Sequence, residues 1–400
     1  MSKPWKMLVL LSLSELLTMT VWFSASAVAP ALRSQWGLSS GQLALLVMAV
    51  QLGFVAGTLL ISITNLADVL NTRHVFSVSA LLSALVNALF AWVAGRFVLG
   101  VTLRCLAGIF LAGVYPPGMK IMAGWFKSGR GFAIGALVGA LTLGSALPHL
   151  VGSMLREQWQ LTIWASSGFS VLGALIVLIC VRDGPHDVPA QRFDFKYFFK
   201  ILKHQPTRLA YLGYFGHMWE LYAVWTWIPV FLMSALKSNG GAQAYSPGLG
   251  AFLIISAGAI GCIGYGYWAD RIGRTLSTIT AMGISGLCCF SVGFLHFIDP
   301  IWLLGICLIW GLTVVADSAQ FSAAASELCE PQYIGTVLTL QTSIGFMLTM
   351  ISIRLVPTIQ TLAGWGTAFA MLGIGPLLGI VAMIRLRLLP EAAKMASGNR

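Results

Sequence analysis

Four titratable residues stand inside long apolar runs of this chain and could carry protons there. Glu15, Glu220 and Asp317 are carboxylic acids, and His217 precedes Glu220 by three residues. Residues three apart share one face of a helix, and a histidine beside a carboxylate can share or relay a proton near neutral pH. We therefore predict that these four residues couple the protein's activity to proton movement. The alternative for Glu15 is a structural pair with a basic group on a neighbouring helix.

Arg104 is the corresponding cation, in the middle of another apolar run. An arginine is always charged, so it needs a partner or water at such a position. It could bind an anionic substrate or control Glu15, or it could belong to a network that stabilises one conformation. We assign Arg104 to a predicted substrate site. The other residues of that site are Trp219, Glu220, Asp317, Gln51, Tyr115 and Gln341. Helix packing is the alternative explanation for the two glutamines.

The composition shows which elements must hold these residues. The chain is 58% hydrophobic and 9% charged, with a mean hydropathy of +0.84, whereas soluble domains contain roughly 25% charged residues. Apolar windows of about 20 residues are long enough to cross a bilayer as helices. The windows and the intervening Gly, Pro and charge clusters predict twelve spans. They lie near residues 7–30, 41–63, 75–95, 97–117, 131–154, 160–181, 208–236, 248–268, 275–297, 301–323, 333–356 and 365–386.

A single long polar stretch divides these spans into two groups of six. It covers residues 182–207 and contains Asp-Gly-Pro and several Lys and Arg residues. We therefore predict an all-α membrane protein with an N-terminal bundle at 1–181, a cytoplasmic linker at 182–207 and a C-terminal bundle at 208–400.

The positive charges predict the orientation of the spans. Most Lys and Arg residues, including those of the linker, fall on one side of the twelve-span arrangement. Arg33, Arg96, Arg156 and Lys237 fall on the other side. The positive-inside rule places both termini in the cytoplasm. This asymmetry accounts for the net charge of +11 without any nucleic-acid partner. The first apolar run is too long for a cleavable signal, so we expect it to remain as a span.

Two charged loops occupy matching places in the two halves. Residues 266–275 read Gly-Tyr-Trp-Ala-Asp-Arg-Ile-Gly-Arg-Thr, and residues 65–73 are a degenerate echo that lacks both glycines. One such loop per half is expected of a duplicated transporter. An ion pair in so tight a loop can form in one conformation and break in another. The predicted gating residues are therefore Asp68, Arg73, Asp270, Arg271 and Arg274.

Three segments resemble the major facilitator superfamily. The first is the 266–275 loop, and the second is Leu-Arg-Cys-Leu-Ala-Gly at 103–108. The third joins Tyr-Pro-Pro-Gly-Met-Lys at 115–120 to Ala-Gly-Trp-Phe at 123–126 and Arg-Gly at 130–131. This third pattern is similar to the anion-cation symporter and nitrate/nitrite branches, in which helix 4 breaks into a short amphipathic turn before helix 5. The resemblance spans essentially the whole chain. It implies the major facilitator fold, with two pseudo-symmetric six-helix bundles in a monomer.

Two features depart from other branches of that superfamily. Drug/proton antiporters carry a Gly-Pro pair in helix 5, whereas Gly144 and Pro148 are separated here. Nitrate carriers have an Arg on helices 2 and 8, and this chain has none on those predicted spans. Both departures disfavour these two activities.

The leading hypothesis is therefore a secondary active transporter in the inner membrane of a bacterium. Two bundles would rock about a central site between helices 1, 4, 7 and 10, giving alternating access within the lipid bilayer. The expected cargo is a small anionic or zwitterionic metabolite that moves with protons. The alternative is proton-driven efflux of a drug-like or heteroaromatic compound, suggested by Glu15 and by the aromatic residues at 219–227.

The sequence disfavours the other classes of membrane protein. It contains neither a Gly-x-x-x-x-Gly-Lys-Ser/Thr loop for a nucleotide nor a His-Glu-x-x-His motif for an intramembrane zinc enzyme. A passive channel would have no need for paired loops that lock alternating states. We therefore expect no catalytic activity, no cofactor and no metal.

Overall fold

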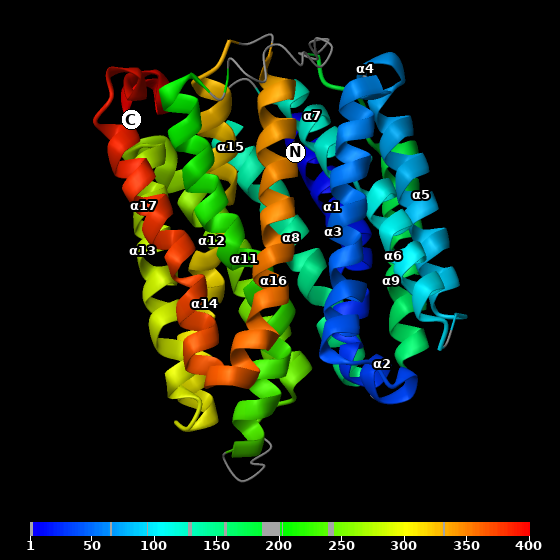
Figure 1. The fold of residues 1–400 in the computed structure, drawn as a ribbon. Helices are drawn as coiled ribbons and strands as arrows, with labels where there is room; N and C mark the ends of the chain where they lie inside the picture. Colours follow the sequence, from blue (N-terminus) through cyan, green and yellow to red (C-terminus); the bar gives the residue numbers. More distant parts are fainter. Residues whose placement is uncertain are drawn as a thin grey trace. The chain divides into compact units, whose positions relative to one another are not determined.

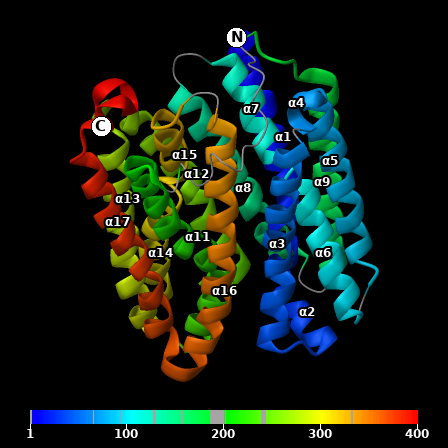
Figure 2. The ribbon, with the colours of Figure 1, turned by 45° about the horizontal axis from the view of Figure 1, so that its top comes forward.

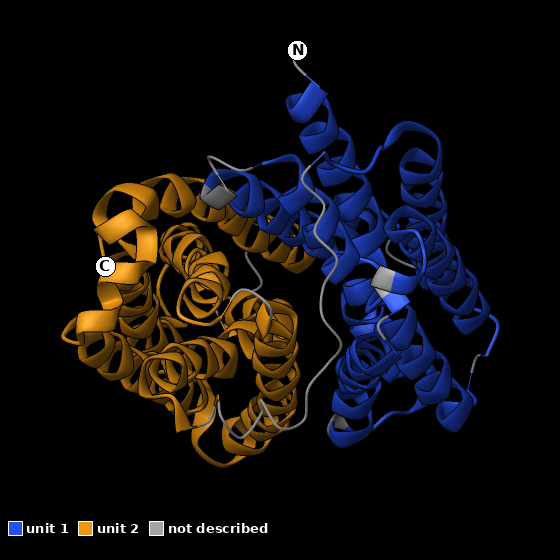
Figure 3. Ribbon diagram, turned by 90° about the horizontal axis from the view of Figure 1, so that it is seen from above, with its two compact units in different colours: residues 1–189 blue, residues 190–400 orange. Residues whose placement is uncertain are grey.

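The chain folds into helices that form two compact units. The computed structural model describes residues 3–64, 66–93, 95–126, 130–155, 158–185, 201, 203–238, 244–330 and 333–400, and these ranges contain no β-strand. Unit 1 is Met1–Pro189 and unit 2 is Ala190–Arg400 (Figure 3). The boundary between the units falls inside the predicted linker 182–207, most of which lies outside the described residues.

Figure 1 shows the helices of each unit in chain order. Unit 1 contains α1 (Lys3–Ala27), α2 (Ala29–Trp36), α3 (Ser40–Thr64), α4 (Leu66–Val69), α5 (Thr72–Phe90), α6 (Phe97–Leu111), α7 (Tyr115–Trp125), α8 (Arg130–Met154) and α9 (Trp159–Cys180). Unit 2 contains α11 (Gln205–Ser238), α12 (Pro247–Ile272), α13 (Arg274–Ser291), η1 (Val292–Leu295), α14 (Pro300–Val314), α15 (Ser318–Glu327), α16 (Ile334–Leu372), α17 (Ile374–Arg387) and η3 (Pro390–Gly398).

The apolar helices match the spans predicted from the sequence. Among the described residues, 11 continuous stretches are long and apolar enough to cross a membrane. The last of them, Ile334–Arg387, has 54 residues, about 80 Å of helix and more than twice the thickness of a hydrocarbon core. It is interrupted at Gly364, where φ is 79°, in the gap between the two final predicted spans. The predicted all-α membrane fold is therefore confirmed.

The two units repeat one packing scheme. In unit 1, α1 packs on α8 and α9, α5 packs on α6 and α9, and α3 packs on α6. In unit 2, α11 packs on α16 and α17, α13 packs on α14 and α17, and α12 packs on α14. Figures 1 and 2 both place α3 beside α6 and α13 beside α17. The correspondence of these pairs supports the duplication that the charged loops indicate.

The fourth span of each unit is broken near its middle. In unit 1 the chain leaves the helical path at residues 112–114, between α6 and α7, and in unit 2 it does so at residues 315–317, between α14 and α15. Pro116 and Pro117 stand in the first turn of α7, where a missing N–H costs nothing. The sequence predicted 97–117 and 301–323 as single spans. The break in unit 1 was implied only by the family resemblance, and the break in unit 2 was missed because no proline marks it.

Glycines allow the second and fourth spans of each unit to approach closely. A Cβ atom on Gly311 of α14 would lie 1.9 Å from the main-chain oxygen of Ile254 in α12. A Cβ atom on Gly108 of α6 would lie 2.0 Å from the main-chain oxygen of Val50 in α3. No side chain fits at such distances. Small residues thus bring the two backbones into contact, as is usual between membrane helices.

This packing predicts the effect of a single methyl group on α14. Gly311→Ala should destabilise the protein by about 1–3 kcal/mol because the backbone of α12 must move away. Gly305→Ala is the matched control on the same helix, since a Cβ atom there meets nothing within 4 Å. The control should be neutral or stabilising because alanine favours a helix over glycine. The measurement is the midpoint of thermal unfolding of each purified variant in detergent. Equal midpoints for the two variants would contradict the close approach.

Candidate functional site

Arg104, on α6, is held by acceptors from two neighbouring helices. Its NH1 group donates to the main-chain oxygen of Val21 (3.1 Å), to Oγ of Ser24 (3.2 Å) and to Oδ1 of Asn87 (3.0 Å). Its NH2 group donates to the main-chain oxygen of Trp22 at 2.5 Å. The residue is 1% exposed. A substrate contact through NH1 or NH2 would require these bonds to open.

Asn87, on α5, is the centre of this polar cluster and was missed by the sequence analysis. Its Oδ1 atom also accepts from Oγ of Ser24 (3.0 Å), and its Nδ2 atom donates to α9 through the main-chain oxygen of Ile163 (3.1 Å) and Oγ of Ser167 (3.0 Å). One amide therefore joins α1, α6 and α9 to α5. An asparagine inside the apolar run 75–95 was the signal that could have identified it.

Glu15, on α1, lies apart from Arg104. The acceptors that α1 offers to Arg104 are at residues 21–24, which places them roughly 9–13 Å further along the helix. Glu15 is 0% exposed, and within the described ranges neither carboxyl oxygen has a hydrogen-bond partner. A Cβ atom on Gly118 would lie 2.9 Å from its Oε2 atom, so the carboxyl group faces the first turn of α7. Burial of an unpaired charge is costly, which makes Glu15 a candidate proton-binding residue.

His217, on α11, contacts Asp317 rather than Glu220. Its Nδ1 atom lies 2.8 Å from Oδ1 of Asp317, and both side chains are almost fully buried. The imidazole ring also packs beside the rings of Tyr214 and Phe321, with centroid distances of 6.0 and 5.6 Å. The predicted pairing of His217 with Glu220 is therefore wrong. Helical spacing brought the two residues to one side of α11, but Asp317, the residue that precedes α15, contacts the imidazole instead.

Glu220 instead joins three helices of unit 2. Its Oε1 atom accepts from Nε1 of Trp310 (2.6 Å) and from the thiol of Cys289 (3.1 Å), and its Oε2 atom accepts from Oγ of Ser285 (3.0 Å). These donors come from α13 and α14. Trp219, the preceding residue, points elsewhere: its Nε1 atom donates to the main-chain oxygen of Met371 (3.3 Å). Adjacent residues project about 100° apart on a helix, so these two predicted substrate residues meet different helices.

Glu15 and His217 occupy matching places in the two units. Each lies on the first span of its unit, and each meets the fourth span next to its break. Glu15 faces Gly118 in α7, and His217 contacts Asp317, the residue that precedes α15. Broken helices at mid-membrane expose main-chain groups and mark binding sites in proteins with internal repeats. The structure thus places Glu15 at one of these positions and His217 with Asp317 at the other, whereas Glu220 bonds to α13 and α14.

The remaining predicted substrate residues differ in how fully they are bonded. Gln51 is buried on α3, and its amide nitrogen, in the orientation that satisfies both atoms, donates to the main-chain oxygens of Val47 (2.7 Å) and Met48 (3.2 Å). Tyr115 is half-buried and begins α7. Gln341 is 1% exposed on α16, and neither atom of its amide has a partner in the described part of the chain. Gln341 is therefore the predicted substrate residue with an uncommitted donor and acceptor.

The charged loop of unit 2 forms a compact network. Arg274 donates to Oδ1 of Asp270 (2.8 Å), to Oε1 of Gln320 (2.8 Å) and to Oε1 of Glu327 (3.1 Å). Arg271 lies outside this network, because its guanidinium group stacks 4.1 Å from the ring centroid of Tyr267. Glu327 is a further acidic residue that the sequence analysis missed.

In unit 1 the corresponding loop is held by Asp183, which follows α9. Nε of Arg73 pairs with Oδ2 of Asp183 (3.0 Å), its NH1 group donates to the main-chain oxygen of Val181 (3.1 Å), and Nδ2 of Asn71 donates to the same Asp183 oxygen (3.1 Å). The side chain of Asp68 lies outside the described residues. Asp183 was also missed as a partner, because it stands in the stretch assigned to the linker.

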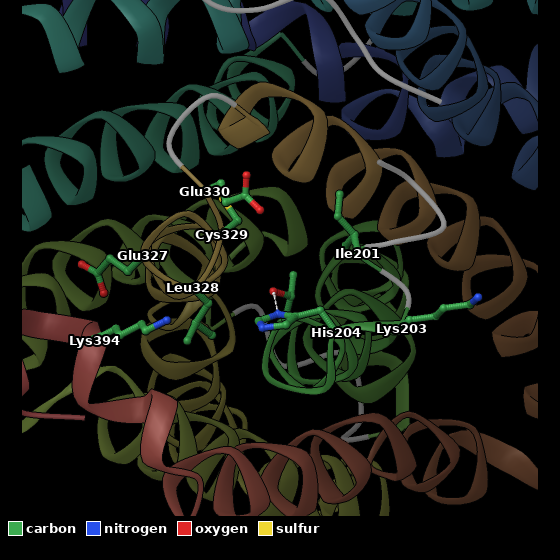
Figure 4. A pocket seen from close by; sticks show the side chains of 9 residues that line it. Ile201, Lys203, His204, Glu327, Leu328, Cys329, Glu330 and Lys394 are labelled. Carbon is green, nitrogen blue, oxygen red and sulfur yellow. Dashed lines mark hydrogen bonds between the residues drawn. The ribbon is translucent and has the colours of Figure 1, made fainter. Parts of the chain in front are cut away.

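A cavity of about 610 Å³ lies at the end of unit 2 where α11 begins (Figure 4). It is lined by Ile201, Lys203, His204, Thr207, Glu327, Leu328, Cys329, Glu330 and Lys394. In Figure 4 Lys394 and His204 point into the space between α15 and α11, whereas Lys203 points away from it. His217 lies ten residues further along α11 than Thr207, or about 15 Å. The cavity therefore contains none of the residues that the sequence assigned to a site.

Comparisons with known proteins agree with this architecture. A family model described as Major Facilitator Superfamily matches residues 11–353. An uncharacterized MFS-type transporter of Mycobacterium tuberculosis strain CDC 1551 is 24% identical over 337 residues, which cover 81% of this chain and 72% of the relative. The 4-hydroxybenzoate transporter PcaK of Pseudomonas aeruginosa is 28% identical over 169 residues, or 41% of this chain and 36% of the relative.

A solved structure resembles the whole fold. The human organic anion transporter MFSD10 (TETRAN) superimposes with a TM-score of 0.67 and 15% sequence identity, covering 96% of this chain and 100% of that one. At so low an identity the likeness concerns the fold alone.

The cluster around Asn87 predicts a large effect of a small substitution. Asn87→Ala removes acceptors from the charged Arg104 and from Ser24, so we expect a loss of about 1–3 kcal/mol in the free energy of unfolding. Ser83→Ala is the control on the same helix, because it removes a neutral 3.3 Å contact with Ser170 and should cost less than ~1 kcal/mol. Thermal unfolding midpoints of the two purified variants provide the test. A smaller loss for Asn87→Ala than for Ser83→Ala would show that the amide is not the centre of the cluster.

Proposed function

Because the chain belongs to the major facilitator superfamily, we propose that it is a proton-coupled transporter of a small organic anion. The membership makes the protein a multi-pass membrane transporter rather than an enzyme. The observation that carries the proton coupling is the placement of Glu15 and of the His217–Asp317 pair. They are buried titratable groups at equivalent positions beside the broken fourth spans of the two units.

The titratable groups support a two-part proton path. Glu15 has no bonding partner in the described structure, so its carboxyl group can gain and lose a proton without breaking a hydrogen bond. The His217–Asp317 contact, at 2.8 Å, joins α11 to the residue that precedes α15. A change in the charge of this contact would alter how α11 holds the break before α15. Glu220, in contrast, holds three helices together through three donors, and we assign it a structural role.

The proposed substrate is an aromatic carboxylate. The partial similarity to the 4-hydroxybenzoate transporter of P. aeruginosa supports this class. Gln341 supports it as well, because an uncommitted buried amide can donate to a carboxylate. Arg104 then acts as a positioning residue that fixes α1 against α5 and α6, since its NH1 and NH2 donors are already bonded.

We place the protein in the inner membrane with both termini in the cytoplasm, as a monomer. The supporting observation for the orientation is the asymmetry of Lys and Arg between the two sides of the predicted spans. The alternative function is proton-driven efflux of a drug-like or heteroaromatic compound. The direction of transport in proteoliposomes distinguishes this efflux from uptake of an acid.

Proton coupling predicts a split between two transport assays. In proteoliposomes with an imposed pH gradient, the intact protein should concentrate radiolabelled 4-hydroxybenzoate. Glu15→Gln or Asp317→Asn should abolish this accumulation but retain counterflow, because exchange needs no net proton movement.

Glu220→Gln is the comparison variant for the coupling test. It should lower the thermal unfolding midpoint yet still allow accumulation, because its role is to hold helices together. Accumulation that survives in both Glu15→Gln and Asp317→Asn would overturn the coupling model. Export of 4-hydroxybenzoate would favour efflux as the function. No binding of 4-hydroxybenzoate at all would favour another compound as the substrate.

The charge of the substrate predicts the order of two variants at Gln341. Gln341→Ala should weaken binding of 4-hydroxybenzoate by about tenfold through loss of a hydrogen bond to a charged group. Gln341→Glu should weaken it further, because a carboxylate repels an anion in a buried site. The measurement is the shift in the thermal unfolding midpoint with increasing 4-hydroxybenzoate, since a ligand of the folded state raises it. Tighter binding of 4-hydroxybenzoate by Gln341→Glu would show that Gln341 does not contact the substrate carboxylate.

A further inference from the structure

The chain that follows α17 folds back onto the charged loop of unit 2. Residues 390–400 comprise η3 and the two residues after it. Nδ2 of Asn399 donates to the main-chain oxygen of Asp270 at 3.2 Å, and Oγ1 of Thr275 donates to the main-chain oxygen of Arg400 at 2.9 Å. Arg387, at the end of α17, donates to Oγ1 of Thr275 at 3.0 Å. The segment thus contacts both ends of the loop 270–275.

Gly273 is shaped to receive this segment. Its φ is +96°, and a Cβ atom built on it would lie 2.0 Å from the main-chain oxygen of Arg400 and 2.2 Å from that of Asn399. Only glycine allows both this backbone conformation and this approach. The turn of the charged loop is therefore a seat for the main chain of residues 399 and 400.

Glu327 links the segment to the ion pairs of the loop. Its Oε1 atom accepts from NH2 of Arg274 (3.1 Å), and its Oε2 atom accepts from the main-chain N–H of Ala396 (3.0 Å). The same arginine also bonds to Asp270 and Gln320. One carboxylate therefore serves two elements, and a movement of either element changes the position of the group that holds the other.

Unit 1 contains a related contact at the matching place. The chain that leaves α9 supplies the main-chain oxygen of Val181 and the carboxylate of Asp183, and both bond to Arg73 in the loop of that unit. In each unit, the chain leaving the last helix holds the charged loop between the second and third spans. The two contacts use different residues but join the same two elements in each unit. We therefore attribute them to the repeated architecture and not to one chance hydrogen bond.

We propose that residues 390–400 form a latch on the charged loop of unit 2 and that latch and loop are released together through Glu327. With the latch in place, the loop keeps the arrangement in which Arg274 bonds to Asp270 and Glu327. Without it, the loop loses the contacts at Asp270, Gly273 and Thr275, and its alternative arrangements become more populated. This inference concerns unit 2 alone and does not depend on the substrate or on proton coupling.

The test compares amide hydrogen exchange in the full chain and in three variants, each in detergent micelles. The variants are a chain ended after Leu389, Asn399→Ala and Glu327→Gln. We expect peptides covering residues 270–275 to exchange about tenfold faster in the shortened chain, and less than that in Asn399→Ala, which removes one hydrogen bond. Glu327→Gln should accelerate exchange in both the loop and the latch, because it removes the charge that pairs with Arg274 and turns an NH2 donor toward one of the two donors that now face separate carboxylate oxygens.

Peptides from unit 1 provide the internal control for folding. They should exchange at the same rate in all variants, so a general loss of structure would be recognised at once. Exchange of residues 270–275 that is unchanged in both the shortened chain and Glu327→Gln would overturn the proposal. So would exchange of residues 390–400 in the full chain at the rate of a free peptide, because the segment would then not be docked.

A second measurement isolates the seat at Gly273. Gly273→Ala introduces both strain from a positive φ and a collision with the latch, whereas Gly364→Ala introduces strain alone, since its φ is +79° and nothing lies within 4 Å. In the full chain, Gly273→Ala should lower the thermal unfolding midpoint more than Gly364→Ala. In the chain ended after Leu389 the two losses should become similar. Equal losses in the full chain would show that the latch does not occupy this seat.

Discussion

A charge inside a bundle of apolar helices must be surrounded by its own acceptors, and the arrangement of unit 1 follows from this constraint. Arg104 cannot lose its proton, so α1 turns main-chain oxygens and Ser24 toward it while α5 contributes Asn87. Asn87 in turn bonds to α9. The positions of four helices are therefore determined together. Through the glycine contact between α6 and α3, the second span then packs against this group of four helices.

Unit 2 repeats the topology with a group of opposite charge type. Glu220, on the first span of unit 2, accepts from α13 and α14, so a carboxyl group with neutral donors joins helices there as the guanidinium of Arg104, on the fourth span, joins them in unit 1. The other three predicted proton-coupling residues, Glu15, His217 and Asp317, lie at the breaks of the fourth spans.

The sequence alone was sufficient to predict the membrane spans, the duplication and the short list of unusual residues. Apolar windows and the breaks between them are local features, and a helix in lipid satisfies its own main-chain hydrogen bonds without help from the rest of the chain. Each intramembrane charge was identifiable for the same reason, because a charged residue within an apolar run is visible in the sequence before its partners are known. Asn87 and Glu327 are also polar residues in or next to apolar runs. They were not predicted as functional because residues with more distinctive chemistry were preferred.

Only the tertiary structure decided which residues are partners. Helical periodicity showed that His217 and Glu220 share one side of α11, yet the first turned to Asp317 and the second to Trp310. It could not show that Trp219 faces Met371 while its neighbour faces α13 and α14. Spacing along a helix determines the direction of a side chain relative to its own axis. The identity of the group it meets depends on how distant helices pack, because that packing brings together residues about a hundred positions apart.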